Sequence, residues 1–214
     1  MGVGIYVRTK YTDKLSYIME NDNWQGISVT YVLPEKNVDN ILLNEKKCIE
    51  SAQYIAKIKL RDKPRNYLSS TRWKVEILEI YKGDSSLKKG QIIDYYTTSG
   101  YLMAESDAWI GGFTNLMKED REYIIYFNAG LVEDNKIKNY VSPGDAYFRY
   151  FCIDDLENIT DQKLYKKNEN IYPMELVLKN EFFAENQQTI EKIQAFKDAF
   201  FEEWNISAQI NAGK

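Results

Sequence analysis

The amino-acid sequence predicts a mainly β protein, a barrel of five or more antiparallel strands with flanking α-helices, α+β by content. Two strand patterns joined by one turn support this prediction: WKVEILEIY begins at Trp73, and QIIDYYTT ends at Thr98. The connection KGDSSLKKG holds two glycines and the polar residues that build turns, so we expect an antiparallel hairpin. Within the first strand the apolar residues change phase at Ile77 and Leu78, which predicts a β-bulge. Bulges curl a sheet toward a closed barrel.

The segment before the barrel predicts a short strand and then a helix. GISVTYVL, residues 26–33, alternates as a strand does and stops at Pro34. From Asn37 the spacing becomes helical, with Asn37 or Asp39 as the cap. NVDNILLNEKKCIESA is therefore an expected amphipathic helix, whose inner face carries Val38, Ile41, Leu42, Glu45, Cys48, Ile49 and Ala52.

Three further barrel strands are expected after this helix. AQYIAKIKL alternates up to Leu60, and residues 122–128 form a second strong pattern. A hairpin around Glu133 to Lys136 leads to a last aromatic strand, which buries Tyr147, Arg149 and Phe151 or the opposite set. The connection over residues 99–116 is long enough to predict a functional loop.

The C-terminal residues predict one amphipathic helix that docks on the barrel. Asn186 is a candidate cap, and the apolar residues that follow recur at helical spacing as Ile190, Ile193, Phe196, Phe200 and Trp204. We therefore divide the chain into an N-terminal segment (1–37) that packs on the main domain, a barrel domain with its leading helix (38–153) and a C-terminal extension (154–214).

The composition argues against several classes of function. There are 28 basic and 32 acidic residues, a formal net charge of −4, so phosphate backbones would be repelled. The chain has no histidine, which removes the commonest general base and the commonest zinc ligand. We expect no catalytic residues, no metal site and no cofactor. No stretch approaches the ~20 apolar residues of a transmembrane helix.

The two cysteines, Cys48 and Cys152, lack the spacing of a redox motif. Two alternatives stay open for them: a disulfide, or two small buried side chains. A disulfide would close a loop of about 100 residues, which the chain-entropy model predicts to stabilise the fold by roughly 4 to 5 kcal/mol.

Three segments together resemble a known group of proteins: IESAQYIAKIKL, then WKVEILEIYKGDSSLKKGQIIDYYTT, then LMKEDREYIIYF. They resemble small bacterial extracytoplasmic proteins with OB-type barrels, related to netrin-like and tissue-inhibitor-of-metalloproteinase domains. The resemblance covers roughly residues 38–128. It implies an OB-like barrel and a secreted protein or lipoprotein, tethered in that case by an N-terminal lipid anchor missing from this chain. Inhibitors of this type begin with a metal-binding cysteine, whereas Cys48 is internal, so protease inhibition is not implied.

The function we expect is a non-catalytic extracytoplasmic binding or interaction module for an unknown protein, peptide or saccharide. OB barrels offer a curved sheet face and adjacent loops for recognition. The candidate ligand-binding residues are Tyr95 and Tyr96 on the second hairpin strand, with Tyr101 and Trp109 in the long connection.

Two other classes of function remain as alternatives. Single-stranded nucleic-acid binding needs aromatic platforms and a positive groove; the lysines that could form one are Lys57, Lys59, Lys74, Lys82, Lys88 and Lys89. A carboxylate-dependent hydrolase needs two facing acids, for which Glu105 with Asp107, or Asp154 with Asp155, are the candidates.

Overall fold

The computed structural model describes residues 23–206 except 31, 68–69, 99–100, 104–107, 134–135, 138 and 161–170, together with residues 18 and 21. For residues 30, 101–103, 108–111 and 171 it describes the backbone alone. The helices are η1 (Glu35–Asn37), α3 (Val38–Ser51), α4 (Met174–Val177) and α5 (Gln187–Glu203). The strands are β1 (Ile27–Thr30), β2 (Tyr54–Leu60), β3 (Arg65–Asn66), β4 (Ser70–Lys82), β5 (Ile92–Thr98), β6 (Tyr101–Met103), β7 (Ala108–Gly111), β8 (Glu122–Ala129), β9 (Val132–Glu133), β10 (Lys136–Ile137), β11 (Tyr140–Val141), β12 (Tyr150–Cys152) and β13 (Ile171–Pro173).

Five strands close into a mixed β-barrel, consistent with an OB-like fold. Their order is β11, β5, β4, β2, β8, and a further pairing of β8 with β11 completes the circle. The pairings are antiparallel except that of β5 with β11, which is parallel. The predicted fold class, a β-barrel with flanking helices, is confirmed.

The hairpin of β4 and β5 has the predicted pairing, with Trp73 opposite Tyr95. On its other side β4 pairs with β2, and there the register skips Leu78 between Ile77 and Glu79. The predicted bulge is therefore confirmed. A second bulge lies at Tyr81, which the register also skips. Because each bulge bends its strand and increases the twist, β4 can belong to the closed barrel along its full length.

A second sheet draws its strands from distant parts of the chain, in the order β13, β1, β7, β6. β1 is antiparallel to β13 and parallel to β7. The prediction of a loop over residues 99–116 is wrong where β6 and β7 pair with each other as a hairpin. The strands form because pairing with β1 provides backbone hydrogen-bond partners that the connection would otherwise lack.

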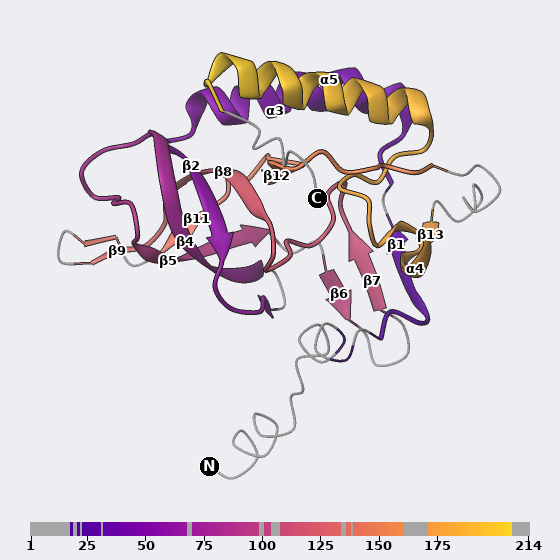
Figure 1. The fold of residues 1–214 in the computed structure, drawn as a ribbon, viewed down its shortest axis with the longest axis horizontal. Coiled ribbons are helices and arrows are strands. Elements are labelled where there is room, and N and C mark those ends of the chain that lie inside the picture. Colours follow the sequence, from indigo (N-terminus) through magenta and orange to yellow (C-terminus); the bar gives the residue numbers. More distant parts are fainter. Residues whose placement is uncertain are drawn as a thin grey trace, which may run out of the picture.

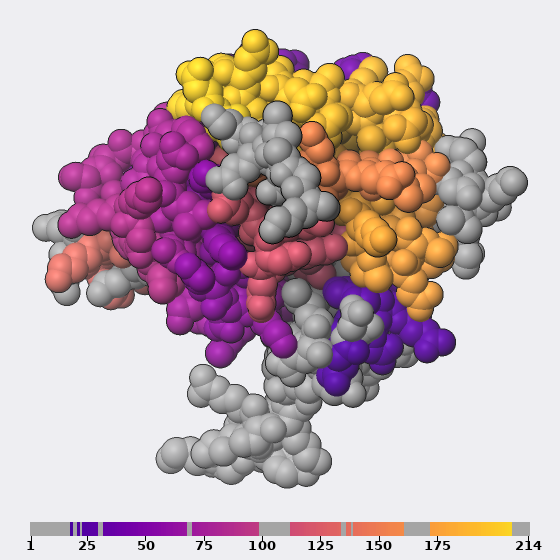
Figure 2. Space-filling model, in the orientation of Figure 1, coloured from indigo at the N-terminus to yellow at the C-terminus, as the bar shows by residue number. Residues whose placement is uncertain are grey.

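Two helices lie side by side across one face of the barrel, near β2, β8 and β12 (Figure 1). The leading helix α3 lies where it was predicted, but the predicted cap is wrong, because the side chain of Asn37 makes no capping hydrogen bond and Asp39 lies inside the helix. Lys192 of α5 forms an ion pair with Asp39 of α3 at 2.8 Å. α5 begins at the predicted cap, where the side chain of Asn186 accepts the N–H of Thr189 at 2.9 Å. In the space-filling view α5 runs as a yellow ridge above the magenta and purple barrel (Figure 2).

The barrel wall separates two hydrophobic cores. Tyr150 and Cys152 of β12 belong to the core that fills the barrel and continues to the second sheet, while Phe151 between them belongs to the core under α3 and α5. β12 is shorter than the predicted aromatic strand because Arg149 has a φ of 70°, which is incompatible with an extended strand. Within the described residues, no helix has the length and apolarity that crossing a membrane requires.

Candidate functional site

Two groups of polar residues in the described part of the chain carry chemistry that a functional site could use. One group is buried beneath α5 and contains a lysine, a carboxylate and a thiol. The other is exposed on the outer face of β4 and β5 and contains tyrosines and arginines. Their burial, and the room each leaves for a ligand, decide between them.

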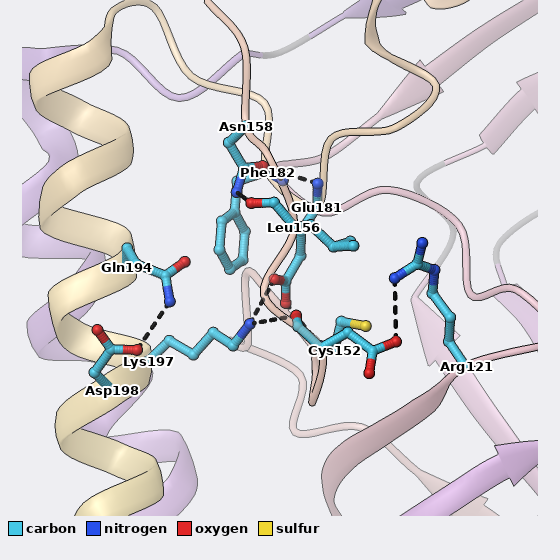
Figure 3. Close-up of polar contacts among 10 residues, drawn as sticks. Arg121, Cys152, Leu156, Asn158, Glu181, Phe182, Gln194, Lys197 and Asp198 are labelled. Atoms are coloured by element: carbon cyan, nitrogen blue, oxygen red, sulfur yellow. Dashed lines mark hydrogen bonds and ion pairs between the residues drawn. The ribbon is translucent and has the colours of Figure 1, made fainter. Parts of the chain in front are cut away.

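The buried group is centred on an ion pair between α5 and the chain that precedes it (Figure 3). Lys197 is 1% exposed, and its Nζ is 2.7 Å from Oε2 of Glu181. The other carboxylate oxygen of Glu181 accepts the N–H of Cys152 at 2.7 Å. The lysine also lies over the rings of Phe182 and Phe201, 5.9 Å and 5.5 Å from their centroids. All these contacts join α5, residues 181–182 and β12 to one another.

The protonation states of this group do not suit nucleophilic catalysis. Burial raises the pKa of Glu181 to about 7, although Lys197 acts to lower it. Burial and the charge of Glu181 raise the pKa of the Cys152 thiol to about 11, so the reactive thiolate is scarce at neutral pH. The cavity beside Cys152 and Arg121 has a volume of about 10 Å³, close to the minimum for one water. This group therefore supports the fold and leaves no room for a substrate.

A second buried carboxylate, Glu45, anchors α3. It has no exposed surface. It accepts a hydrogen bond from the hydroxyl of Tyr126, and it accepts two more from the backbone N–H of Tyr147, at 2.7 Å, and of Phe148, at 3.2 Å. Burial raises the pKa of Glu45 to about 7, while these backbone hydrogen bonds and the charge of Arg149 act to lower it. Because its acceptor oxygens are taken by the protein itself, Glu45 also has a structural role.

The exposed group begins with two tyrosines near one end of the β4–β5 hairpin. Tyr96 of β5 faces outward, and Tyr67 lies in the turn between β3 and β4 with 44% of its surface exposed. Their ring centroids are 6.5 Å apart, and the ring planes are inclined by 33°. The backbone hydrogen bonds between Tyr67 and Ser70 hold this turn against β4. The two rings thus form a partly exposed aromatic surface.

Two arginines continue this surface across the sheet. Arg65 of β3 is directly opposite Arg72 of β4, and Arg72 is directly opposite Tyr96 of β5. Directly opposed residues point to the same face, so these three side chains form one row across three strands. Nε of Arg72 is 3.9 Å from a carboxylate oxygen of Asp94, whereas Arg65 is exposed and has no ion pair with any described residue. We call Arg65, Tyr67, Arg72 and Tyr96 the tyrosine–arginine face.

A shallow hollow adjoins the tyrosine–arginine face. It has a volume of about 210 Å³ and lies where the first residues of β5 are not paired with β11 among the described residues. Both charged and apolar groups line it: Lys74, Asp94, Ile92, Ile137 and Tyr140.

Of the four tyrosine and tryptophan residues predicted to bind a ligand, Tyr96 alone has a described side chain on this face. Tyr95 has no exposed surface, and its hydroxyl donates to the carbonyl of Arg149 at 2.9 Å inside the barrel. It cannot stack on a ligand in this position. Tyr101 and Trp109 lie on the paired strands β6 and β7 of the second sheet, and their side chains lie outside the described part of the structure.

Several described residues of the two alternative functions are engaged in other contacts. Asp154 forms an ion pair with Arg121 at 3.1 Å, while its neighbour Asp155 is exposed. Glu105 and Asp107 lie outside the described residues. Among the lysines, Lys57 forms ion pairs with Glu79 and Glu122, and Lys82 donates to the carbonyl of Glu50. These contacts neutralise or occupy part of the predicted positive groove.

The cysteines are free thiols on opposite sides of the barrel wall. Cys48 is buried in the hydrophobic core under α3 and α5, and Cys152 is buried in the other hydrophobic core, on the opposite side of β8 and β12. This separation by a layer of strands speaks against the disulfide alternative and favours two buried side chains.

Arg65, Tyr67 and Arg72 were not among the predicted site residues, although the sequence contains a signal for Arg72. Arg72 alternates with the buried Trp73, so it shares the outer face with Lys74. Nothing local marks Arg65 and Tyr67, because the pairing of β3 with β4 brings them there.

No protein-family model matches this chain, and no curated protein is significantly similar to it. In the described part of the chain, no three acidic or cysteine side chains gather in a cluster that could hold a metal ion. The site therefore has to be interpreted from its own chemistry.

Proposed function

We propose that this protein is a non-catalytic binding module, whose ligand lies on the tyrosine–arginine face and reaches into the adjoining hollow. One observation carries the proposal: an exposed and a half-buried tyrosine ring lie close together, beside two arginines that are directly opposite each other on paired strands. Aromatic rings give a ligand a large contact area at a low cost in conformational entropy. The guanidinium groups bind anionic groups in a defined orientation and so select the charge of the ligand.

The proposed place of action is outside the cytoplasm. The support for it is the resemblance of the helix, hairpin and strand patterns to extracytoplasmic OB-type proteins. A shallow, open face suits peptides and saccharides as ligands, whereas an enclosed pocket suits small molecules.

Binding of the labelled protein to arrayed peptides and arrayed neutral and acidic oligosaccharides tests the proposal. We expect a subset of one array to bind, and the variant Tyr67→Ala/Tyr96→Ala to bind that subset about tenfold more weakly, because the stacking surface is lost. Tyr147→Ala is the matched control, since Tyr147 is 42% exposed but lies outside the tyrosine–arginine face. Equal binding by the wild-type protein and the double variant would contradict the proposal.

A further inference from the structure

The position of Arg65 directly opposite Arg72 indicates which chemical group the ligand carries. This inference rests on the proposed function. Like charges directly opposite each other on two strands destabilise the sheet. Asp94 compensates the charge of Arg72 in part, at 3.9 Å, but no described residue forms an ion pair with Arg65. The sheet thus holds an excess of positive charge at one point, beside the ring of Tyr96. An anionic group placed between the two guanidinium groups would relieve the repulsion.

The surroundings of the arginine pair favour a ligand rich in hydroxyl groups. Asp94 of β5 is directly opposite Lys74, and Glu76 of the same face is paired with Arg61. Carboxylates accept hydrogen bonds from hydroxyl groups, and Lys74 can donate one. Each of these groups is half-buried or exposed at the face and so can contact a bound molecule.

The same surroundings disfavour a nucleic acid. A single strand carries a phosphate on every nucleotide and needs a continuous positive groove. Beyond the arginine pair, a phosphate along this face would meet the carboxylates of Asp94 and Glu76. A ligand with one anion beside a ring fits better than one with an anion on every unit.

We infer that the tyrosine–arginine face binds an acidic oligosaccharide through a uronic acid, whose carboxylate lies between Arg65 and Arg72. The apolar face of the sugar ring stacks on Tyr96 and Tyr67. The hydroxyl groups of the flanking sugars bind Asp94 and Lys74 along the hollow.

Calorimetric titration with a xylotriose that carries a single glucuronic acid, with its methyl ester and with oligothymidylate tests this inference. The ester keeps the sugar rings and removes the charge. We expect the acid to bind at least about tenfold more tightly than the ester, as hydrogen bonds between charged groups require. The variant Arg65→Gln/Arg72→Gln should lose that same factor for the acid and bind the ester as the wild type does. The control Lys88→Gln/Lys89→Gln removes two charges from the opposite, exposed turn of the hairpin and should leave both affinities unchanged.

The stability of the arginine variant gives an independent measurement. Because the substitution removes a like-charge repulsion, Arg65→Gln/Arg72→Gln should unfold at a urea concentration no lower than that of the wild type. A loss of binding in this variant then reports on the ligand contact and not on unfolding.

The outcomes separate this inference from the proposed function. If the ester binds as tightly as the acid and Tyr67→Ala weakens both, the uronic acid is wrong and the binding module stands. Tighter binding of oligothymidylate than of the acid would overturn the inference in favour of a nucleic acid. Absence of binding to every probe at about 1 mM would also overturn it, and the arrays described above would still decide whether the protein is a binding module.

Discussion

Glu45 and Glu181 are both carboxylates buried against the barrel, at 0% and 3% exposure, but the protein stabilises their charges in different ways. Glu181 faces the ammonium group of Lys197 on α5. Glu45 is itself on α3 and faces the hydroxyl of Tyr126 and the backbone N–H groups of a loop. Each interaction fixes one of the two helices that lie side by side on the barrel (Figure 1).

The two carboxylates differ in how their contacts respond to the loss of one partner. An ion pair fails when either partner is removed, because the remaining charge is buried and unpaired. A carboxylate held by several dipoles loses only one of them at a time, and it can also become neutral by binding a proton. Because the pKa of each carboxylate is raised to about 7, we expect both contacts to depend on pH. The contact that holds α5 depends in addition on the single residue Lys197.

The largest effect should follow removal of the lysine. Lys197→Met should lower the free energy of unfolding at pH 8 by about 3–5 kcal/mol, the cost of leaving a buried carboxylate without its partner. Urea unfolding measures this change. Lys192→Met, which removes the exposed lysine that pairs with Asp39, is the control and should cost at most about 1 kcal/mol.

The double variant Glu181→Gln/Lys197→Met sharpens this result. It should recover part of the loss, because no unpaired charge is left in the core. If Lys197→Met were as stable as the wild type, the ion pair would not be the anchor of α5.

The next effect concerns the pH dependence of α3. Glu45 has a pKa of about 7 in the folded protein against an ordinary value of 4.5, so the folded state retains a proton that the unfolded state has lost. The stability that this proton gives is fully present below about pH 4.5 and is lost as the pH rises through 7, by about 3 kcal/mol in total.

Comparison with Glu45→Gln isolates this contribution, since glutamine does not titrate and all other groups are shared. The wild type should lose about 3 kcal/mol relative to the variant between about pH 4 and pH 8. Urea unfolding at several pH values measures the difference. Parallel curves for the two proteins would mean that Glu45 does not change its protonation in this range.

A smaller effect is expected from Tyr126→Phe. The hydroxyl donates to Glu45 and accepts the N–H of Arg149 at 2.8 Å, so its removal leaves two buried groups each short of one partner. We expect a loss of about 1–3 kcal/mol by thermal or urea unfolding. Tyr81→Phe removes a half-buried hydroxyl that donates to the exposed Glu79, and it should change the stability by less than about 0.5 kcal/mol.

The smallest effect distinguishes the first turns of the two helices. Asn186 caps α5 through its side chain, whereas Asn37 makes no side-chain cap to α3. Asn186→Ala should therefore cost about 1 kcal/mol. Asn37→Ala should cost almost nothing, and equal losses in both variants would contradict the assignment of the caps.

Local patterns predicted the regular elements well. The alternation around Trp73, the phase change at Leu78 and the helical stripe from Ile190 onward are properties of neighbouring residues, so they could be interpreted before any pairing was known. The orientation of Tyr95 and Tyr96 could also have been predicted from the sequence. Asp94 marks the outer face of β5, and Tyr96, two residues later, shares it.

The buried partners of charged residues depend on contacts between distant segments, which local patterns do not show. Lys197 stands inside the apolar stripe of α5, four residues after Ile193, and Glu45 stands inside the stripe of α3. A charge at such a position indicates a buried partner, but the partner of Lys197 lies on another segment and cannot be identified from periodicity. The same holds for Arg65, which reaches its place only through the pairing of β3 with β4.

The position of β1 in the second sheet determines when that sheet can form during synthesis. β1 lies between β7 and β13, so its two edges are satisfied by strands that follow it by about 80 and about 140 residues in the chain. The barrel, in contrast, has all five strands once Val141 has left the ribosome. Among the described strands, the first to be synthesised thus pairs with the last, and a stalled or truncated chain that ends before Ile171 would expose one edge of β1 to other unfolded chains.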